Sequence, residues 1–121
     1  MVWYPSPEDV ISSNKIVMRS DKHRHRLLRS IGAIQAKIDA IQESEHMGLT
    51  YQAARFMQDL TVLHAFDGGN HRTAYAITSL FLIQNGMTVN IVRADISYSF
   101  VKNIAKKEVQ EVQKWIERHL V

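Results

Sequence analysis

At 121 residues the chain is long enough for one hydrophobic core but too short for two ordinary domains, so we expect a single domain over residues 1–121. Hydrophobic residues make up 45% of the chain, yet every apolar run is too short to span a membrane. The absence of cysteine excludes disulfides and thiolate metal sites and suits a reducing compartment. Because the first residues lack a signal-peptide pattern, we expect a cytoplasmic protein without a membrane partner.

The chain is basic, with 15 Lys and Arg residues against 12 Asp and Glu and a net charge of +3. Part of this charge is concentrated in residues 22–26. A basic surface suits nucleic acid, an acidic protein or a nucleotide. A nucleic-acid binder would also need aromatic residues interleaved with the basic ones, or a recognition helix, and the sequence shows neither pattern. The simplest interpretation of residues 22–26 is a solvated loop leading into a helix.

Three helices are predicted in the first half of the chain. Ser6 followed by Pro7 is typical of a capped helix start, and this helix should run to about Met18. A second helix, which Gly48 ends, is predicted from apolar residues spaced by three and four positions, which would form one buried stripe. These residues are Leu27, Ile31, Ile34, Ile38 and Ile41. Thr50 should cap the third helix, which ends at His64.

The second half should contain three more helices. The segment that begins at Asn70 is apolar nearly all round, which predicts a helix at the centre of the fold, ended by Gly86 in the left-handed conformation. Residues 88–92 are expected to be extended, and Asp95 should cap a helix through Ile104. A last helix follows from the stripe of Val109, Val112, Ile116 and Leu120. The predicted fold is all-α, a compact bundle of about six helices around a buried central helix.

The segment from His64 to Ala74 has the composition of a reaction site. Gly68 and Gly69 can adopt backbone conformations that direct several N–H groups into one hollow. A helix that starts at Asn70 adds its own unpaired N–H groups and its dipole. The sequence therefore predicts a cradle for phosphate groups in a loop that follows His64.

Two side chains of this segment are candidates for a catalytic role. An imidazole that titrates near neutrality can take the proton of an attacking hydroxyl, so His64 is a candidate general base, although a lone histidine is usually structural. Arg72 can fork onto phosphate oxygens, although an isolated arginine is usually a surface residue. Asn70 suits a helix cap as well as a phosphate contact. Phe66 should anchor the loop to the core, and Trp115 should be a core or rim residue.

The segment resembles the signature of the Fic/Doc proteins, His-Pro-Phe-x-Asp/Glu-Gly-Asn-Gly/Lys-Arg-x-x-Arg. Five positions match directly: His64, Phe66, Gly69, Asn70 and Arg72. Its Thr-Ala ending and the short chain resemble the Doc (death-on-curing) branch. Weaker similarity extends to residues 6–9, 31–36 and 80–86.

This resemblance implies a nucleotide-dependent transferase. Such an enzyme binds a nucleoside triphosphate such as ATP at residues 68–72 and moves AMP or a phosphoryl group to a hydroxyl of a target protein. The resemblance assigns the general base to His64 and phosphate contact to Arg72. For the Doc branch it also implies a toxin that acts alongside an antitoxin protein. The inhibitory-helix pattern of some members, Ser/Thr-x-x-x-Glu-Gly/Asn, does not occur in this sequence, so any restraint is expected from another polypeptide.

Three departures from the family pattern bear on the chemistry that it implies. Gly68 stands where the metal-binding acid is usual, with Asp67 one place earlier as the candidate ligand of Mg²⁺. His71 replaces the glycine or lysine that orients the nucleotide, and a partly charged imidazole is the expected substitute for lysine. Tyr75 replaces a second arginine, which the Doc branch also lacks.

The sequence is compatible with several alternatives. The same fold without its chemistry would be a nucleotide- or protein-binding module, and a basic helical nucleic-acid binder is the third class. A transition-metal site made by His64, Asp67 and His71 has the right residue types but an awkward spacing. Family members hold the acceptor segment with an extended flap, which would fall at residues 34–45, whereas the periodicity there predicts a helix. The sequence does not identify the target protein, the nucleotide or the oligomeric state.

Overall fold

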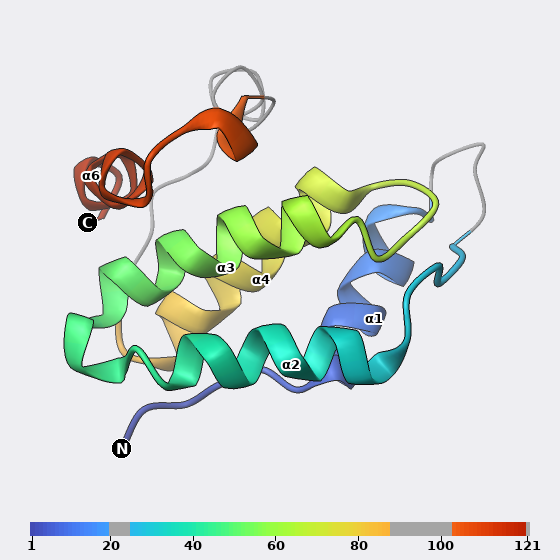
Figure 1. Cartoon of the computed structure of the whole chain (residues 1–121), viewed down its shortest axis with the longest axis horizontal. Coiled ribbons are helices and arrows are strands. Elements are labelled where there is room, and N and C mark those ends of the chain that lie inside the picture. The colour runs from blue at the N-terminus through green and yellow to red at the C-terminus, as the bar shows by residue number, and fades with distance from the viewer. Residues whose placement is uncertain (20–24, 88–102, 121) are drawn as a thin grey trace.

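The computed structural model of this protein describes residues 1–19, 25–87 and 103–120 (Figure 1). The regular secondary structure in these ranges is helical, apart from one isolated antiparallel bridge. The α-helices are α1 (Pro7–Val17), α2 (Ile31–Gln42), α3 (Leu49–Leu63), α4 (Asn70–Gln84) and α6 (Val109–Arg118), with short 3-10 turns η1 (Glu45–Met47) and η2 (Ile104–Lys106). The all-α prediction is confirmed. The extended piece expected at 88–92, and all but the last two residues of the helix expected at 95–104, lie outside the described residues.

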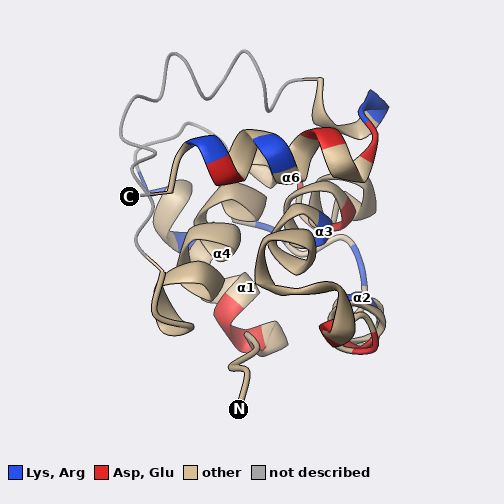
Figure 2. Ribbon diagram, turned by 90° about the vertical axis from the view of Figure 1, so that its left-hand side faces the viewer, with Lys and Arg blue, Asp and Glu red and all other residues tan. Residues whose placement is uncertain are grey.

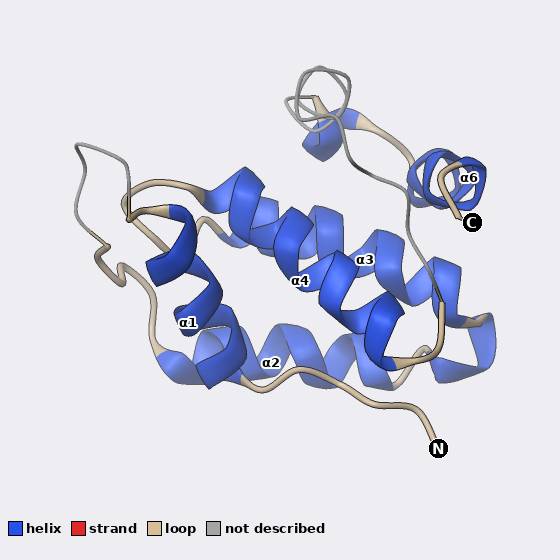
Figure 3. Ribbon diagram, turned by 180° about the vertical axis from the view of Figure 1, so that it is seen from behind, coloured by secondary structure: helices blue, strands red, loops and turns tan. Residues whose placement is uncertain are grey.

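Helix α1 begins as its capping residues predict. The Ser6 hydroxyl accepts a hydrogen bond from the Asp9 N–H at 3.2 Å, and the Asp9 carboxylate accepts one from the Ser6 N–H at 2.8 Å. This reciprocal pair satisfies two N–H groups that a helix start leaves open. In Figure 3 the helix crosses one end of α4, against which it packs.

Helix α2 is shorter than the predicted stripe. The Ser30 hydroxyl caps it by accepting from the Ala33 N–H at 3.0 Å, so Leu27 lies before the helix. Ile34, Ile38 and Ile41 are buried as predicted, whereas Ile31 is 51% exposed in the first turn. Since residues 31–42 are helical and 45–47 form η1, the suggested flap at 34–45 is wrong, and the helical period prevails.

Helix α3 starts one residue before the predicted cap. Its N-cap is Gly48, with a φ of 94°, and no side chain caps it. The predicted cap, Thr50, lies inside the first turn, where its hydroxyl accepts from Gln113 and donates to Glu117. The prediction of a Thr50 cap is therefore wrong, because this hydroxyl joins α3 to α6.

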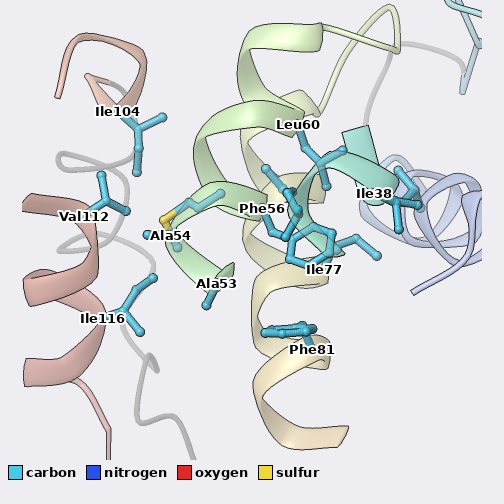
Figure 4. Close-up of a cluster of buried hydrophobic side chains, with 14 of the residues drawn as sticks. Ile38, Ala53, Ala54, Phe56, Leu60, Ile77, Phe81, Ile104, Val112 and Ile116 are labelled. Atoms are coloured by element: carbon cyan, nitrogen blue, oxygen red, sulfur yellow. The ribbon is translucent and has the colours of Figure 1, made fainter. Parts of the chain in front are cut away.

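The core lies on both sides of α3. This helix packs against α2, α4 and α6 (Figure 4), and its own contribution is Ala53, Ala54, Phe56, Met57 and Leu60, all at most 4% exposed. The Phe56 ring lies 5.0 Å from that of Phe81 on α4, centre to centre. Helix α4 also has a solvent face, since Ile83 is 58% exposed. Gly86 ends α4 at a φ of 85°, as predicted.

Helix α6 packs against α3 on the side opposite α2 (Figure 1). Val112 and Ile116 are fully buried, which confirms the predicted stripe. Lysine, arginine and glutamate residues lie along its outer side (Figure 2). None of the described helices is long and apolar enough to cross a membrane.

Candidate functional site

His64 ends α3 in an unusual backbone conformation. Its φ of 51° and ψ of 54° are left-handed, and among the described residues it is the only residue other than glycine with a positive φ. This conformation is unfavourable for a side chain with a Cβ and is often found at functional sites. The Arg29 Nε–H donates to the Leu63 carbonyl at 3.3 Å, which satisfies the helix end just before His64. The exposed imidazole thus stands at a sharp turn.

Asn70 closes the loop that follows His64. Its Oδ1 accepts from the Phe66 N–H at 3.0 Å, and its Nδ2 donates to the Phe66 carbonyl at 2.8 Å. The side chain is 6% exposed. The N-cap of α4 is Gly69, so the interpretation of Asn70 as a helix cap is wrong. Asn70 instead shapes the loop, because both ends of its amide are bonded to Phe66.

The same amide contacts the candidate base. The Nδ2 of Asn70 lies 3.3 Å from Nδ1 of His64. The amide orientation is set by Phe66, whose carbonyl needs a donor and whose N–H needs an acceptor. The Nδ1 of His64 is therefore an acceptor here, and the neutral imidazole carries its hydrogen on Nε2.

Gly69 is required for close packing against α1. Its φ is 72°, and a Cβ at this position would lie 2.8 Å from the Met18 Sδ and 3.1 Å from the Val17 Cγ2. A side chain would therefore meet both backbone strain and a clash. Figure 1 shows the loop beside the last turn of α1. The second glycine of the pair is thus demanded by the fold as well as by the predicted cradle.

Arg72 lies across the end of α1. Its Nη1 donates to the Val17 carbonyl at 3.2 Å, and its Nη2 lies 3.7 Å from the Met18 Sδ. The predicted role was contact with phosphate oxygens. A guanidinium has five N–H donors, so it can bind an anion while it keeps or exchanges these contacts.

His71 follows in the first turn of α4 and is half-buried. Burial lowers its pKa below 6.5, and the charge of His64 lowers it further. The neutral imidazole is thus the main form at pH 7. The expected substitution of a charged His71 for lysine is therefore not supported, because a neutral ring does not supply the charge.

Asp67 is exposed on the loop, and its N–H donates to the Arg26 carbonyl at 3.0 Å. The described residues contain no group of three or more His, Asp or Glu side chains that could hold a metal ion. The alternative of a transition-metal site made by His64, Asp67 and His71 is therefore wrong. A single exposed carboxylate remains compatible with Mg²⁺, because this ion usually takes one or two protein carboxylates together with phosphate oxygens.

Residues 25–29, called the extended segment below, run beside the loop. Leu27 forms the antiparallel bridge with Phe66, and the Leu28 N–H donates to the Ala65 carbonyl at 2.7 Å. Phe66 is 2% exposed, which confirms it as the anchor of the loop. The sequence did not predict this segment, because Leu27 also fits the helical period of α2 and was assigned to that helix.

Asn14 of α1 is a site residue that the sequence interpretation missed. It is fully buried, and its Nδ2 donates to the Gly68 carbonyl at 2.9 Å and to the Thr73 hydroxyl at 3.1 Å. Its Oδ1 accepts from Nδ1 of His25 at 2.6 Å. One signal in the sequence pointed to it: Asn14 lies midway between Val10 and Met18, so a polar residue occupies the apolar stripe of α1.

A family model of the Fic/DOC family matches residues 4–82. Because the match covers more than half of the chain, the protein belongs to the Fic/DOC family. The matched range includes α1, α2, α3 and the loop from His64 to Arg72, and thus every residue of the site described above. No match was found among curated proteins.

Proposed function

We propose that this protein transfers part of a nucleoside triphosphate to a hydroxyl group of a target protein. The observation that carries the proposal is the contact between His64 and Asn70, which places a candidate base 3.3 Å from the residue that begins α4. Membership of the Fic/DOC family supports this chemistry. The Doc branch, a toxin role with an antitoxin partner and action in the cytoplasm remain part of the proposal.

The loop and the start of α4 suit the triphosphate. The first N–H groups of a helix and its dipole attract anions, and the left-handed Gly69 turns the backbone at this point. Several cationic residues lie at the end of α1, in the extended segment and in the first turn of α4: Lys15, Arg19, Arg26, Arg29 and Arg72. Their charge would raise the local concentration of an anionic substrate.

His64 would act on the acceptor hydroxyl. In the transfer step the hydroxyl oxygen bonds to a phosphorus atom, the bond from phosphorus to the leaving oxygen breaks, and the imidazole takes the hydroxyl proton. The lone pair of the neutral ring is on Nδ1, which now faces Asn70. Because the side chain is exposed, rotation of the ring away from Asn70 would free Nδ1 for the acceptor.

Asp67 would hold Mg²⁺ in the loaded site. When bound, the ion would offset the negative charge that develops on the phosphate groups during transfer. Asp67 is the only carboxylate between His64 and the end of α4. The N–H groups at the start of α4, together with Arg72, would bind the remaining phosphate oxygens.

The acceptor segment of the target would lie beside residues 26–28. These residues are extended and pair with 65–67, next to His64. The family uses an extended flap for this purpose, and the segment at 26–28 takes the place that residues 34–45 cannot, since those begin inside α2. The backbone of the target would then present its hydroxyl to His64.

A binding module without transfer chemistry is the second candidate. It is favoured by one observation: Gly68 provides no carboxylate where the family pattern has one. Such a protein would bind a nucleotide or a protein through the same loop. It would not need His64.

The deciding experiment uses ATP labelled at either the alpha or the gamma phosphate. The purified protein is incubated with each form in a cell lysate, and His64→Ala is the matched control. Label on a lysate protein from the alpha position indicates AMP transfer, and label from the gamma position indicates phosphoryl transfer. Absence of both labels, with ATP still bound, would favour the binding module. Equal labelling by His64→Ala would contradict the proposed mechanism.

A further inference from the structure

Asn14 bonds to the backbone of the candidate cradle from a distant part of the sequence. It lies 54 residues before Gly68, whose carbonyl accepts its Nδ2–H at 2.9 Å. A peptide group is planar and trans, so its C=O and N–H point in opposite directions. When the Gly68 carbonyl points to α1, the N–H of Gly69 in the same peptide must point away from α1.

The bonds of Asn14 leave its amide no other orientation. The Gly68 carbonyl can only accept, so the nitrogen of the amide must face it, and Oδ1 faces Nδ1 of His25. The same nitrogen donates to the hydroxyl of Thr73 at 3.1 Å, in the first turn of α4. One fully buried side chain thus connects α1, the extended segment, the glycine loop and α4.

We propose that Asn14 is a positioning residue of the anion cradle, which holds the Gly68–Gly69 peptide so that the Gly69 N–H faces the phosphate groups. The inference rests on the proposed function, because a triphosphate is the ligand that the cradle would take. Asn14 would not touch this ligand. It acts through the orientation of one peptide, and loss of its donor would let that peptide rotate about two glycines.

The test is Asn14→Asp, which keeps the shape of the side chain but replaces the donor by a second acceptor. The matched control is Asn85→Asp at the other end of α4, where the Asn85 amide also donates to two carbonyls, those of Trp3 and Phe81. Two quantities are measured at pH 8 for each variant: the ATP affinity by titration calorimetry and amide hydrogen exchange of residues 67–70. The thermal midpoint reports the loss of stability.

We expect Asn14→Asp to weaken ATP binding by about tenfold or more, which corresponds to the loss of one well-placed hydrogen bond. Exchange at residues 67–70 should become faster than the change in global stability explains. Asn85→Asp should lower the thermal midpoint and keep both properties of the loop. The proposal is overturned if the two variants lose ATP affinity in parallel with stability, or if exchange in the loop is unchanged in Asn14→Asp.

Two further results keep the test decisive. If wild-type protein binds no ATP, the proposed function fails, and loop exchange alone decides whether Asn14 positions the peptide. If Asn14→Asp does not fold, Asn14→Ala is compared with Thr73→Val, which removes the other acceptor but keeps the bond to Gly68. Loop exchange should then be fast in Asn14→Ala and normal in Thr73→Val, and equal exchange in both would refute the proposal.

Discussion

At the scale of single residues, His64 combines a proposed chemical role with a strained backbone. The imidazole is exposed, contacts Asn70 and ends α3 at a φ of 51°. An ordinary helix end would favour glycine or asparagine in this conformation. We expect a histidine here to stabilise the fold less than glycine would, and such strained positions are common at functional sites.

Replacement of His64 separates these two effects. His64→Ala should reduce transfer by roughly 10²–10⁴-fold, the usual contribution of a positioned general base, and leave ATP affinity nearly unchanged. His64→Gly should be equally inactive but more stable than His64→Ala by about 1 kcal/mol, because glycine adopts the left-handed conformation freely. Single-turnover rates and denaturant unfolding measure the two effects. Near-normal transfer by either variant would make His64 structural.

A second prediction at this scale concerns Asp67. If its carboxylate holds Mg²⁺ beside the phosphates, the metal should tighten ATP binding, and Asp67→Ala should remove this enhancement without unfolding the protein. Gly68→Asp, which restores the acid of the family pattern, should not increase the enhancement of ATP binding by Mg²⁺ beyond that of the wild type. Titration of ATP with and without Mg²⁺ measures this for all three proteins. If the ATP affinity of the wild-type protein is the same with and without Mg²⁺, the binding module is favoured.

At the scale of elements, the loop between α3 and α4 is held by its neighbours. Asn70 bonds to Phe66 from within, the extended segment pairs with residues 65–67, and the last turn of α1 packs against Gly69. Such a loop has little freedom to adapt to a side chain at Gly69. Gly32 differs, because it lies in the first turn of α2 with the Ser30 hydroxyl 3.8 Å away as the nearest atom that a new Cβ would meet.

These two glycines make a matched pair. Gly69→Ala should destabilise the protein by about 1–3 kcal/mol, because alanine is strained at a φ of 72° and its Cβ would clash with Met18. Gly32→Ala should instead be neutral or stabilise by up to about 1 kcal/mol, because alanine favours a helix. Urea unfolding of both variants tests this difference. A Gly69→Ala protein as stable as wild type would show that the loop can move away from α1.

At the scale of the whole molecule, burial of histidines makes stability depend on pH. The pKa values of His25 and His71 are lowered, mainly by burial and secondarily by the charges of Lys15 and His64 respectively. The unfolded chain, whose histidines titrate near 6.5, therefore binds more protons than the folded chain just below that pH. Acid thus favours the unfolded state through these two groups.

The free energy of unfolding should consequently fall as the pH drops below about 6.5 and level off, as far as these groups contribute, once the folded histidines are also protonated. His71→Asn should make the slope between pH 7.5 and 5.5 shallower, because one of the two groups is gone. Urea unfolding at a series of pH values measures the slope. An unchanged slope in His71→Asn would show that burial of this ring does not affect its titration.

The local elements follow from the sequence alone because their causes are local. The Ser6 cap, the buried residues of the α2 and α6 stripes, and the left-handed Gly86 depend on neighbours a few positions away, and they were predicted correctly. The segment from His64 to Arg72 stood out for the same reason, since its glycines, imidazole and guanidinium are adjacent in the chain.

Tertiary structure decided what depends on distant residues. Leu27 fits the period of α2 but pairs with Phe66, because a backbone partner 39 residues away competes with the helix. Thr50 could have capped α3 but bonds to α6. Asn14 became a site residue only when α1 packed against the glycine loop. Each of these roles is set by hydrogen bonds across the fold, and a buried polar group must take the partner that packing brings to it.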